Sequence, residues 1–286
     1  MRWTIGLLLL LAVACDGTGA TTTSAPATTT TTAPSTSTTT STATPTIGCP
    51  QDAEFVASGQ IDRITQPSSD SRTLGLVSRQ VFDGCERFGF DFDTAEGAPA
   101  TTPPSTTARF LDGERIIRIT LEIDSTVITD QLIETRLVDR IYVVRGLDGA
   151  MFVDLHLREK ANARIAVSNS PARLTLELNP GSGDIGPPPA LSDRTVLVVP
   201  PDEATVDGEF EVAGYARVFE ASVLIVATRG NEVIFSQATP AADWTETWGE
   251  FETEVTLAPG AVNLFVGEQS PQDGSLQGVT LNLTIR

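Results

Sequence analysis

The chain has 286 residues and carries 37 acidic against 19 basic side chains, which gives a formal net charge of −18. This excess of acid excludes nucleic-acid binding as its main function, because such binding requires a basic face. Apart from Cys15, which is treated below, the chain has two cysteines and one histidine, which fall short of a usual four-ligand zinc site, so we expect no metal and no other cofactor.

The first fourteen residues are typical of a secretory signal peptide. Arg2 precedes an apolar run that is too short to span a bilayer, which needs about 20 residues, and small residues then lead into Cys15. The order Ala-Val-Ala-Cys at residues 12–15 resembles a bacterial lipobox. The resemblance implies that residues 1–14 are removed and that Cys15 is diacylated, so that the lipid holds the chain on the outer face of the cytoplasmic membrane. Ordinary signal cleavage, with Cys15 as a bystander, is the alternative.

The segment that follows Cys15, up to residue 48, is predicted to be a disordered stalk. Residues 16–48 contain 16 threonines and 4 serines among 33 positions, and Asp16 is their only charge. This composition offers too little apolar area to offset the entropy lost on ordering the segment.

Cys49 and Cys85 are predicted to form a disulfide. Lipidation of Cys15 would leave these two cysteines as an even pair in an oxidising compartment. The closed loop would stabilise the fold by roughly 3–4 kcal/mol in the chain-entropy model. Two free thiols are the alternative.

Residues 49–180 are predicted to form a first β domain, because apolar and polar residues alternate along several segments. Residues 117–123 and 174–178 show this pattern, and residues 146–149 indicate a hairpin turn. The only helical candidate is a turn or two around residues 129–134.

Parts of this segment resemble the AMIN-like domain of lipoproteins from high-GC bacteria. The resemblance covers roughly residues 59–179, and the stretches that carry it are FDGCERFGFDF at 82–92, VDRIYVVR at 138–145, FVDLHL at 152–157 and SPARL at 170–174. It implies a non-catalytic targeting module that holds envelope proteins at peptidoglycan or at periplasmic assemblies.

Residues 181–192 read GSGDIGPPPALS and are predicted to be a semi-rigid linker before a second β domain at 193–286. About seven short strands in about 95 residues is the count of an immunoglobulin-like sandwich. The stretches PPDEATV at 200–206, VAGYARVFEA at 212–221, WGEF at 248–251 and EQSPQDGS at 268–275 resemble the immunoglobulin-like domain of bacterial spore germination proteins. The predicted fold class is therefore all-β, with two β-sandwich domains.

No catalytic constellation is apparent, and we predict no catalytic residue and no enzyme activity. A triad would have to use His156, the single histidine, which is interpreted as a solvated strand residue on the same face as Asp154. Glu250, Glu252 and Glu254 share one strand face, and their charges are interpreted as favouring solubility rather than acid–base chemistry.

Two groups of residues are candidate binding sites. Glu220, Glu268 and Asp273 would form a recognition edge for calcium or glycan hydroxyls if they converge in space. The competing interpretation is structural: Asp273 satisfies a turn, Glu220 bonds a neighbouring backbone, and Phe219 and Trp248 pack in the core. The second group could bind acidic wall polymers or form internal ion pairs, and it consists of Arg136, Arg140 and Arg145.

The sequence therefore favours a non-catalytic envelope lipoprotein that binds or scaffolds at the cell wall. Its expected partners are the membrane, through the lipid, and peptidoglycan or another envelope protein. The alternative is an accessory subunit that positions a separate envelope enzyme through protein contacts, and a wall-active hydrolase is the remote alternative.

Overall fold

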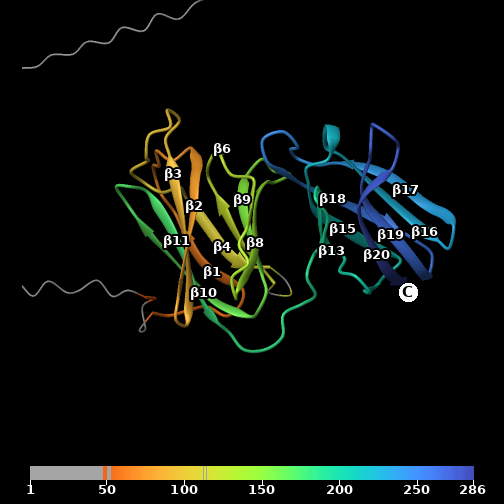
Figure 1. Cartoon of the computed structure of the whole chain (residues 1–286), viewed down its shortest axis with the longest axis horizontal. Helices are drawn as coiled ribbons and strands as arrows, with labels where there is room; N and C mark the ends of the chain where they lie inside the picture. Colours follow the sequence, from red (N-terminus) through yellow and green to blue (C-terminus); the bar gives the residue numbers. More distant parts are fainter. Residues whose placement is uncertain (1–47, 50–52, 112, 114) are drawn as a thin grey trace, which may run out of the picture. The chain divides into compact units, whose positions relative to one another are not determined.

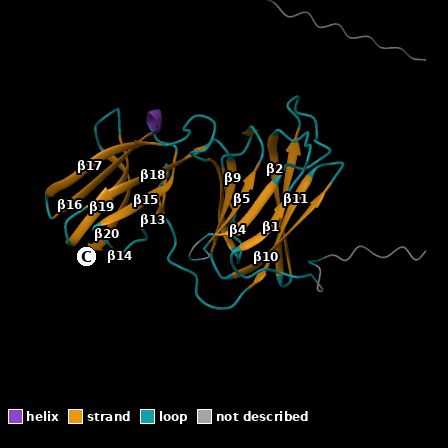
Figure 2. Cartoon of the chain, turned by 180° about the vertical axis from the view of Figure 1, so that it is seen from behind, coloured by secondary structure: helices purple, strands orange, loops and turns teal. Residues whose placement is uncertain are grey.

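A computed structural model describes residues 48–49, 53–111, 113 and 115–286, which all belong to one compact unit. The predicted signal peptide, Cys15 and most of the predicted stalk lie outside the described residues. Among the described residues, no helix is long and apolar enough to cross a membrane. Apart from a single turn of 3-10 helix, the regular structure of the described residues is β-strand, which confirms the predicted fold class (Figures 1 and 2).

The first half of the unit is a sandwich of two sheets. Its strands are β1 (Gln60–Ile64), β2 (Thr73–Phe82), β3 (Cys85–Asp93), β4 (Thr106–Phe110), β5 (Ile116–Leu121), β6 (Ser125–Thr126), β7 (Asp130–Leu132), β8 (Val138–Arg145), β9 (Met151–Leu157), β10 (Ala161–Ser168) and β11 (Arg173–Pro180). One sheet has the order β10-β11-β3-β2-β6. The other contains β1-β4-β5-β9-β8, with β7 added beside β8.

Alternating apolar residues fill the space between these two sheets, as the pattern predicts. Phe88, Phe90 and Phe92 project from β3 into one buried cluster, and the isoleucines and leucines of β5 and β11 meet them there. The predicted hairpin turn joins β8 to β9, and Gly149 adopts a positive φ of 84° in it. This conformation favours glycine.

The second half is also a sandwich. Its elements are β12 (Ala190–Leu191), β13 (Thr195–Val199), β14 (Thr205–Val206), β15 (Glu209–Ala216), the 3-10 turn η1 (Phe219–Ala221), β16 (Ser222–Arg229), β17 (Glu232–Pro240), β18 (Trp248–Thr256), β19 (Gly260–Gln269) and β20 (Leu276–Ile285). One layer is β14-β20-β19-β16-β17, and the other contains β18-β15-β13-β12. The core between the layers includes Phe251, Leu264 and Leu281.

The two halves share one sheet, which sequence reasoning did not anticipate. The order β1-β4-β5-β9-β8-β18-β15-β13-β12 runs from the first half into the second. The junction is a short parallel pairing in which Trp248 lies opposite Val144 and Gly249 opposite Arg145. Backbone hydrogen bonds therefore join the halves directly, in addition to the covalent linker.

Two local expectations differ from the structure. The helical candidate at residues 129–134 is instead the edge strand β7, because its backbone pairs with β8 over Asp130–Leu132. The segment 181–192 is not only a linker: Ala190 and Leu191 form β12, which pairs with β13, and the amide of Gly186 donates to the carbonyl of Gly113 in the first half.

Candidate functional site

An aromatic cluster occupies the seam between the two halves. On β8, Ile141 and Val143 face the core of the first half, whereas Tyr142 and Val144 face the opposite way. From the second half, Tyr215 and Trp248 meet them, and their side chains are buried; the full cluster is Tyr142, Val144, Phe152, Val196, Tyr215 and Trp248. The ring of Tyr142 lies 5.1 Å from that of Tyr215 and 5.0 Å from that of Trp248. Such contacts add to the stabilisation from burial.

A buried ionic group closes the seam on one side. The Arg118 guanidinium donates two hydrogen bonds, of 2.9 and 2.8 Å, to the carboxylate of Asp154 and a third, of 3.0 Å, to Glu250 of the second half. It also lies 3.6 Å from the centre of the Phe152 ring. Burial raises the pKa of Asp154, and the charge of Arg118 acts against that rise. Glu250 therefore makes a structural contact between the two halves, whereas Glu252 and Glu254 are exposed.

His156 lies within the seam, so its interpretation as a solvated residue is wrong. It shares a strand face with Asp154, as predicted, but that face is covered by the second half and only 3% of His156 is exposed. Its Nε2 atom is hydrogen-bonded to the hydroxyl of Tyr215. Burial, together with the positive charges of Arg140, Arg115 and Arg118, lowers the pKa of His156 to about 3. The imidazole ring is therefore neutral, and its Nε2 atom is occupied by the hydrogen bond to Tyr215.

A cleft of about 530 Å³ opens at the same seam and combines aromatic and charged side chains. It is lined by Asp130, Asp193, Arg194, Arg217, Trp244, Thr245 and Trp248. Asp130 comes from β7 of the first half, and the other residues come from the second half. The indole Nε1 of Trp248 donates to the Asp130 carboxylate at 3.3 Å, so both halves contribute to the wall of the cleft.

The loop that carries Trp244 is held in place by Asp243. One oxygen of its carboxylate accepts the amides of Trp244 and Thr245, at 2.6 and 2.9 Å. Burial alone would raise the pKa of Asp243, but these amide donors outweigh it and lower the pKa. Beneath the loop, a Cβ atom on Gly249 would lie 2.2 Å from both the backbone nitrogen and oxygen of Asp243. Glycine is therefore required there for the loop to pack onto β18.

Glu268 holds Arg194, one of the arginines that line this cleft. Its buried carboxylate accepts the amide of Phe219 at 2.7 Å and forms an ion pair of 2.9 Å with Arg194. Phe219 is 44% exposed, so the expectation that it packs in the core is wrong; its ring makes an edge contact with Trp244, 5.5 Å between centroids. Trp248 is buried, but at the seam rather than in the second core.

The three residues of the predicted recognition edge have separate environments. Glu220 is exposed in η1 at a φ of 54°. The carboxylate of Asp273 accepts hydrogen bonds from the amide and hydroxyl of Ser275, at 3.1 and 2.8 Å, as a turn residue does. Among the described residues, no three His, Cys, Asp or Glu side chains are grouped as a metal site. None of the three lines the cleft, and only Glu268 contacts a residue that does, through its ion pair with Arg194.

The three candidate arginines do not form a common basic patch. Arg136 pairs with Glu159 at 2.9 Å, and Arg145 pairs with Asp243 at 3.6 Å and with Glu246 at 3.7 Å. Arg140 lies over the ring of Tyr142, 5.9 Å from its centre. Arg136 and Arg145 therefore form internal ion pairs, and all three are structural contacts of β8 and its neighbourhood.

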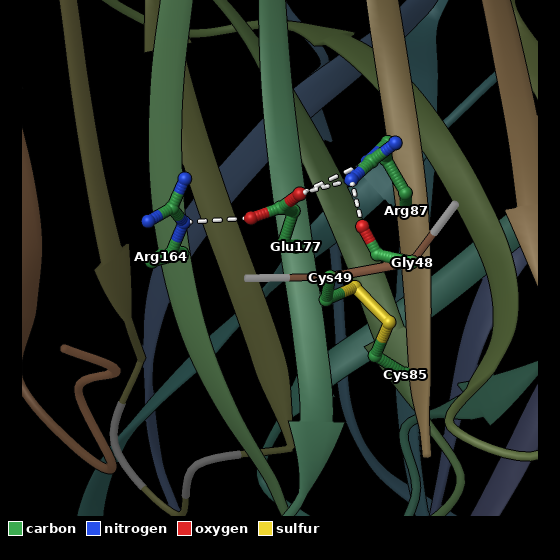
Figure 3. The surroundings of a disulfide bond; sticks show 6 residues. All are labelled: Gly48, Cys49, Cys85, Arg87, Arg164 and Glu177. Atoms are coloured by element: carbon green, nitrogen blue, oxygen red, sulfur yellow. Dashed lines mark hydrogen bonds and ion pairs between the residues drawn. A yellow bond between two sulfur atoms is a disulfide. The ribbon is translucent and has the colours of Figure 1, made fainter. Parts of the chain in front are cut away.

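The predicted disulfide joins Cys49 to Cys85 at the start of the folded unit. Figure 3 shows Glu177 of β11 between two guanidinium groups beside this bond. Glu177 forms ion pairs of 2.7 Å with Arg87 and 2.6 Å with Arg164, and Arg87 also donates to the carbonyl of Gly48 at 2.9 Å. The N-terminal segment is thus fixed on the outer face of the sheet β10-β11-β3-β2-β6.

The cleft offers groups of the kind that bind a ligand. Trp244 offers apolar ring surface, and the arginines and aspartates of the lining offer hydrogen-bond donors and acceptors. The sequence does not reveal it, because Asp130 and Trp244 lie 114 positions apart and in different predicted domains. One signal was present: the YARVFEA and WGEF stretches bring Arg217 and Trp248 into the cleft.

Comparisons with known proteins give one family. No curated protein and no solved structure matches the chain. A family model described as the immunoglobulin-like domain of bacterial spore germination matches residues 196–275, which extend from β13 to the turn before β20. The resemblance predicted for the second half is thereby confirmed, and the motif residues Tyr215 and Trp248 of that half form the seam.

Proposed function

We propose that the chain is a non-catalytic cell-envelope lipoprotein, held in the membrane by lipid on Cys15, whose folded unit binds the cell wall. The observation that carries the proposal is the disulfide between Cys49 and Cys85. Disulfides persist in oxidising compartments outside the cytosol. The bond uses two of the three cysteines and leaves Cys15 as the one available for lipid.

The attachment of the N-terminal segment supports a role in display. Cys49 is bonded covalently to β3, and Arg87 holds the carbonyl of the preceding residue, Gly48. A segment fixed in this way would carry the folded unit as one object at the end of the stalk. The shared sheet and the buried seam serve the same end, because they keep both halves together.

The chemistry of the described residues supports a binding function. His156, the only histidine, is buried and hydrogen-bonded to Tyr215, so it is not presented to a substrate. The seam carboxylates Asp154 and Glu250 are both paired with Arg118. The open cleft with Trp244, in contrast, offers ring surface and hydrogen-bonding groups to solvent.

Two measurements test the proposal. Mass spectrometry of the protein purified from membranes should find a diacylated Cys15 at the N-terminus, and Cys15→Ser should release the chain from the membrane fraction. The full chain should also sediment with purified peptidoglycan. An intact Met1 with an unmodified Cys15 would refute the anchor. Failure to sediment, together with capture of a stable envelope enzyme, would favour the accessory role, and release of soluble wall fragments by the protein would indicate a hydrolase.

A further inference from the structure

From the geometry of the cleft at the seam, we infer that it binds a segment of wall glycan, with a sugar ring against Trp244 and its hydroxyls bonded by Arg217 and Asp130. This inference deepens the wall-binding part of the proposed function, on which it rests, and does not depend on the lipid anchor. It names the ligand class and the residues that recognise it.

The aromatic surface of the cleft is open to solvent. Trp244 lines the cleft, is half-buried and belongs to none of the hydrophobic clusters of the described residues. Phe219, which is not part of the lining, packs against Trp244 edge to face and is 44% exposed. Aromatic residues are only 6% of the chain, and many of them fill its cores. Exposed aromatic rings that line a cleft are typical of ligand sites. A sugar ring offers the matching surface, because its C–H groups form an apolar face.

The polar lining supplies both donors and acceptors. The Arg217 side chain has no ion-pair partner among the described residues, and the one hydrogen bond of its guanidinium is a long contact of 3.4 Å from Nη1 to the hydroxyl of Thr129. Asp130 and Asp193 lie in the same cleft as Arg194 and Arg217.

The balance of charge in this lining distinguishes between ligand classes. Two aspartates offset two arginines, so the lining offers no field that would favour a polyanion. Sugar hydroxyls both donate and accept hydrogen bonds, and they match a lining that contains carboxylates and guanidinium groups together. Neutral sugar rings therefore suit the cleft better than a phosphate or carboxylate polymer does.

The cleft is also preorganised. Asp243 bonds the amides on either side of the Trp244 side chain, Gly249 allows the loop to lie close on β18, and Glu268 fixes Arg194. A ligand would therefore order few side chains on binding, which lowers its entropic cost. The volume of about 530 Å³ falls within the range of about 300–1,000 Å³ that small-molecule sites occupy.

Tryptophan fluorescence provides the test, because two of the three tryptophans in the chain line the cleft. The full chain, purified in detergent, is titrated with a tetramer of N-acetylglucosamine and, separately, with polyglutamate of similar length. We expect a saturable change with the sugar alone. Trp244→Ala and Arg217→Ala should each weaken sugar binding at least tenfold, whereas Arg63→Ala, an exposed arginine on β1, should leave it unchanged.

The controls separate this inference from the wider proposal. Unfolding curves for each variant identify a folding defect, and Arg217→Ala removes no core side chain, so it remains informative if Trp244→Ala is unstable. If both variants still sediment with peptidoglycan as the unaltered chain does, the cleft is not the site although wall binding stands. Equal binding of polyglutamate would overturn the glycan assignment, and an unaltered chain that binds neither sugar nor wall would refute both proposals.

Discussion

Protonation of His156 should control how the stability of the protein depends on pH. The ring is 3% exposed, hydrogen-bonded to Tyr215 and surrounded by the positive charges of Arg140, Arg115 and Arg118. Its folded-state pKa is about 3, against about 6.5 in the unfolded chain. A lowered pKa means that the unfolded state binds a proton first, so stability contributed by the neutral ring is present above pH 6.5 and is lost as the pH falls.

The size of this effect follows from the two pKa values. Between pH 7 and pH 5 the unfolded histidine becomes almost fully protonated while the folded one stays neutral, which lowers the free energy of unfolding by about 2 kcal/mol. His156→Gln removes the titration but keeps a side chain able to bond Tyr215. When the pH falls from 7 to 5, we therefore expect the unaltered chain to lose about 2 kcal/mol more of its free energy of unfolding than this variant loses.

Urea unfolding at both pH values, followed by tryptophan fluorescence, measures this difference. Other groups, including Asp154 with its raised pKa, titrate in both proteins and cancel in the comparison. Because His156 is the only histidine in the chain, an NMR titration of its ring signals gives the folded-state pKa without ambiguity. A midpoint near 6.5 in the folded protein, or a stability difference that does not change with pH, would refute the reasoning.

Three further variants test other parts of the fold. Arg118→Met should lower the free energy of unfolding in urea by about 3–5 kcal/mol, because it leaves the carboxylate of Asp154 buried without its partner. Adding Asp154→Leu should recover most of that loss, and a double variant as unstable as the single one would contradict this reasoning. Cys85→Ser should cost roughly 3–4 kcal/mol, from the loss of a loop constraint across 36 positions, and the same loss in the unaltered chain after reduction is the control. Gly249→Ala should cost about 1–3 kcal/mol, because its Cβ meets backbone, whereas Gly75→Ala, whose Cβ meets only the end of the Asp93 side chain, should change thermal stability little; equal losses would contradict the packing argument.

Sequence reasoning identified strands by the face that each of them places in a core. Alternation at residues 117–123 and 174–178 is strict because polar side chains on these strands face away from the buried layer. Strand β9 shows what alternation cannot reveal. Both of its faces are buried, so Asp154 and His156 were interpreted as solvent-facing although each has a partner within the protein.

The candidate site was harder to predict for a related reason. Pattern analysis places residues on strands and faces, but the cleft depends on which outer faces meet. Thr129 and Asp130 at the start of β7 approach Arg217 and Trp248 only because β18 pairs with β8. A pairing between strands about 100 positions apart, two residues long and parallel, leaves no periodic signal in either segment.

This junction also explains why the stretches that carry the family resemblance of the second half need not mark a ligand. Within YARVFEA and WGEF, Tyr215 and Trp248 pack at the seam, and Glu250 pairs with Arg118 of the first half. Each of these residues would be exposed in an isolated second half, where an aromatic ring and a lone carboxylate on a sheet face would look like a binding surface. Because the first half buries them, these residues hold the two halves together. Trp244 and Arg217 retain access to solvent and are therefore the groups available to bind a ligand.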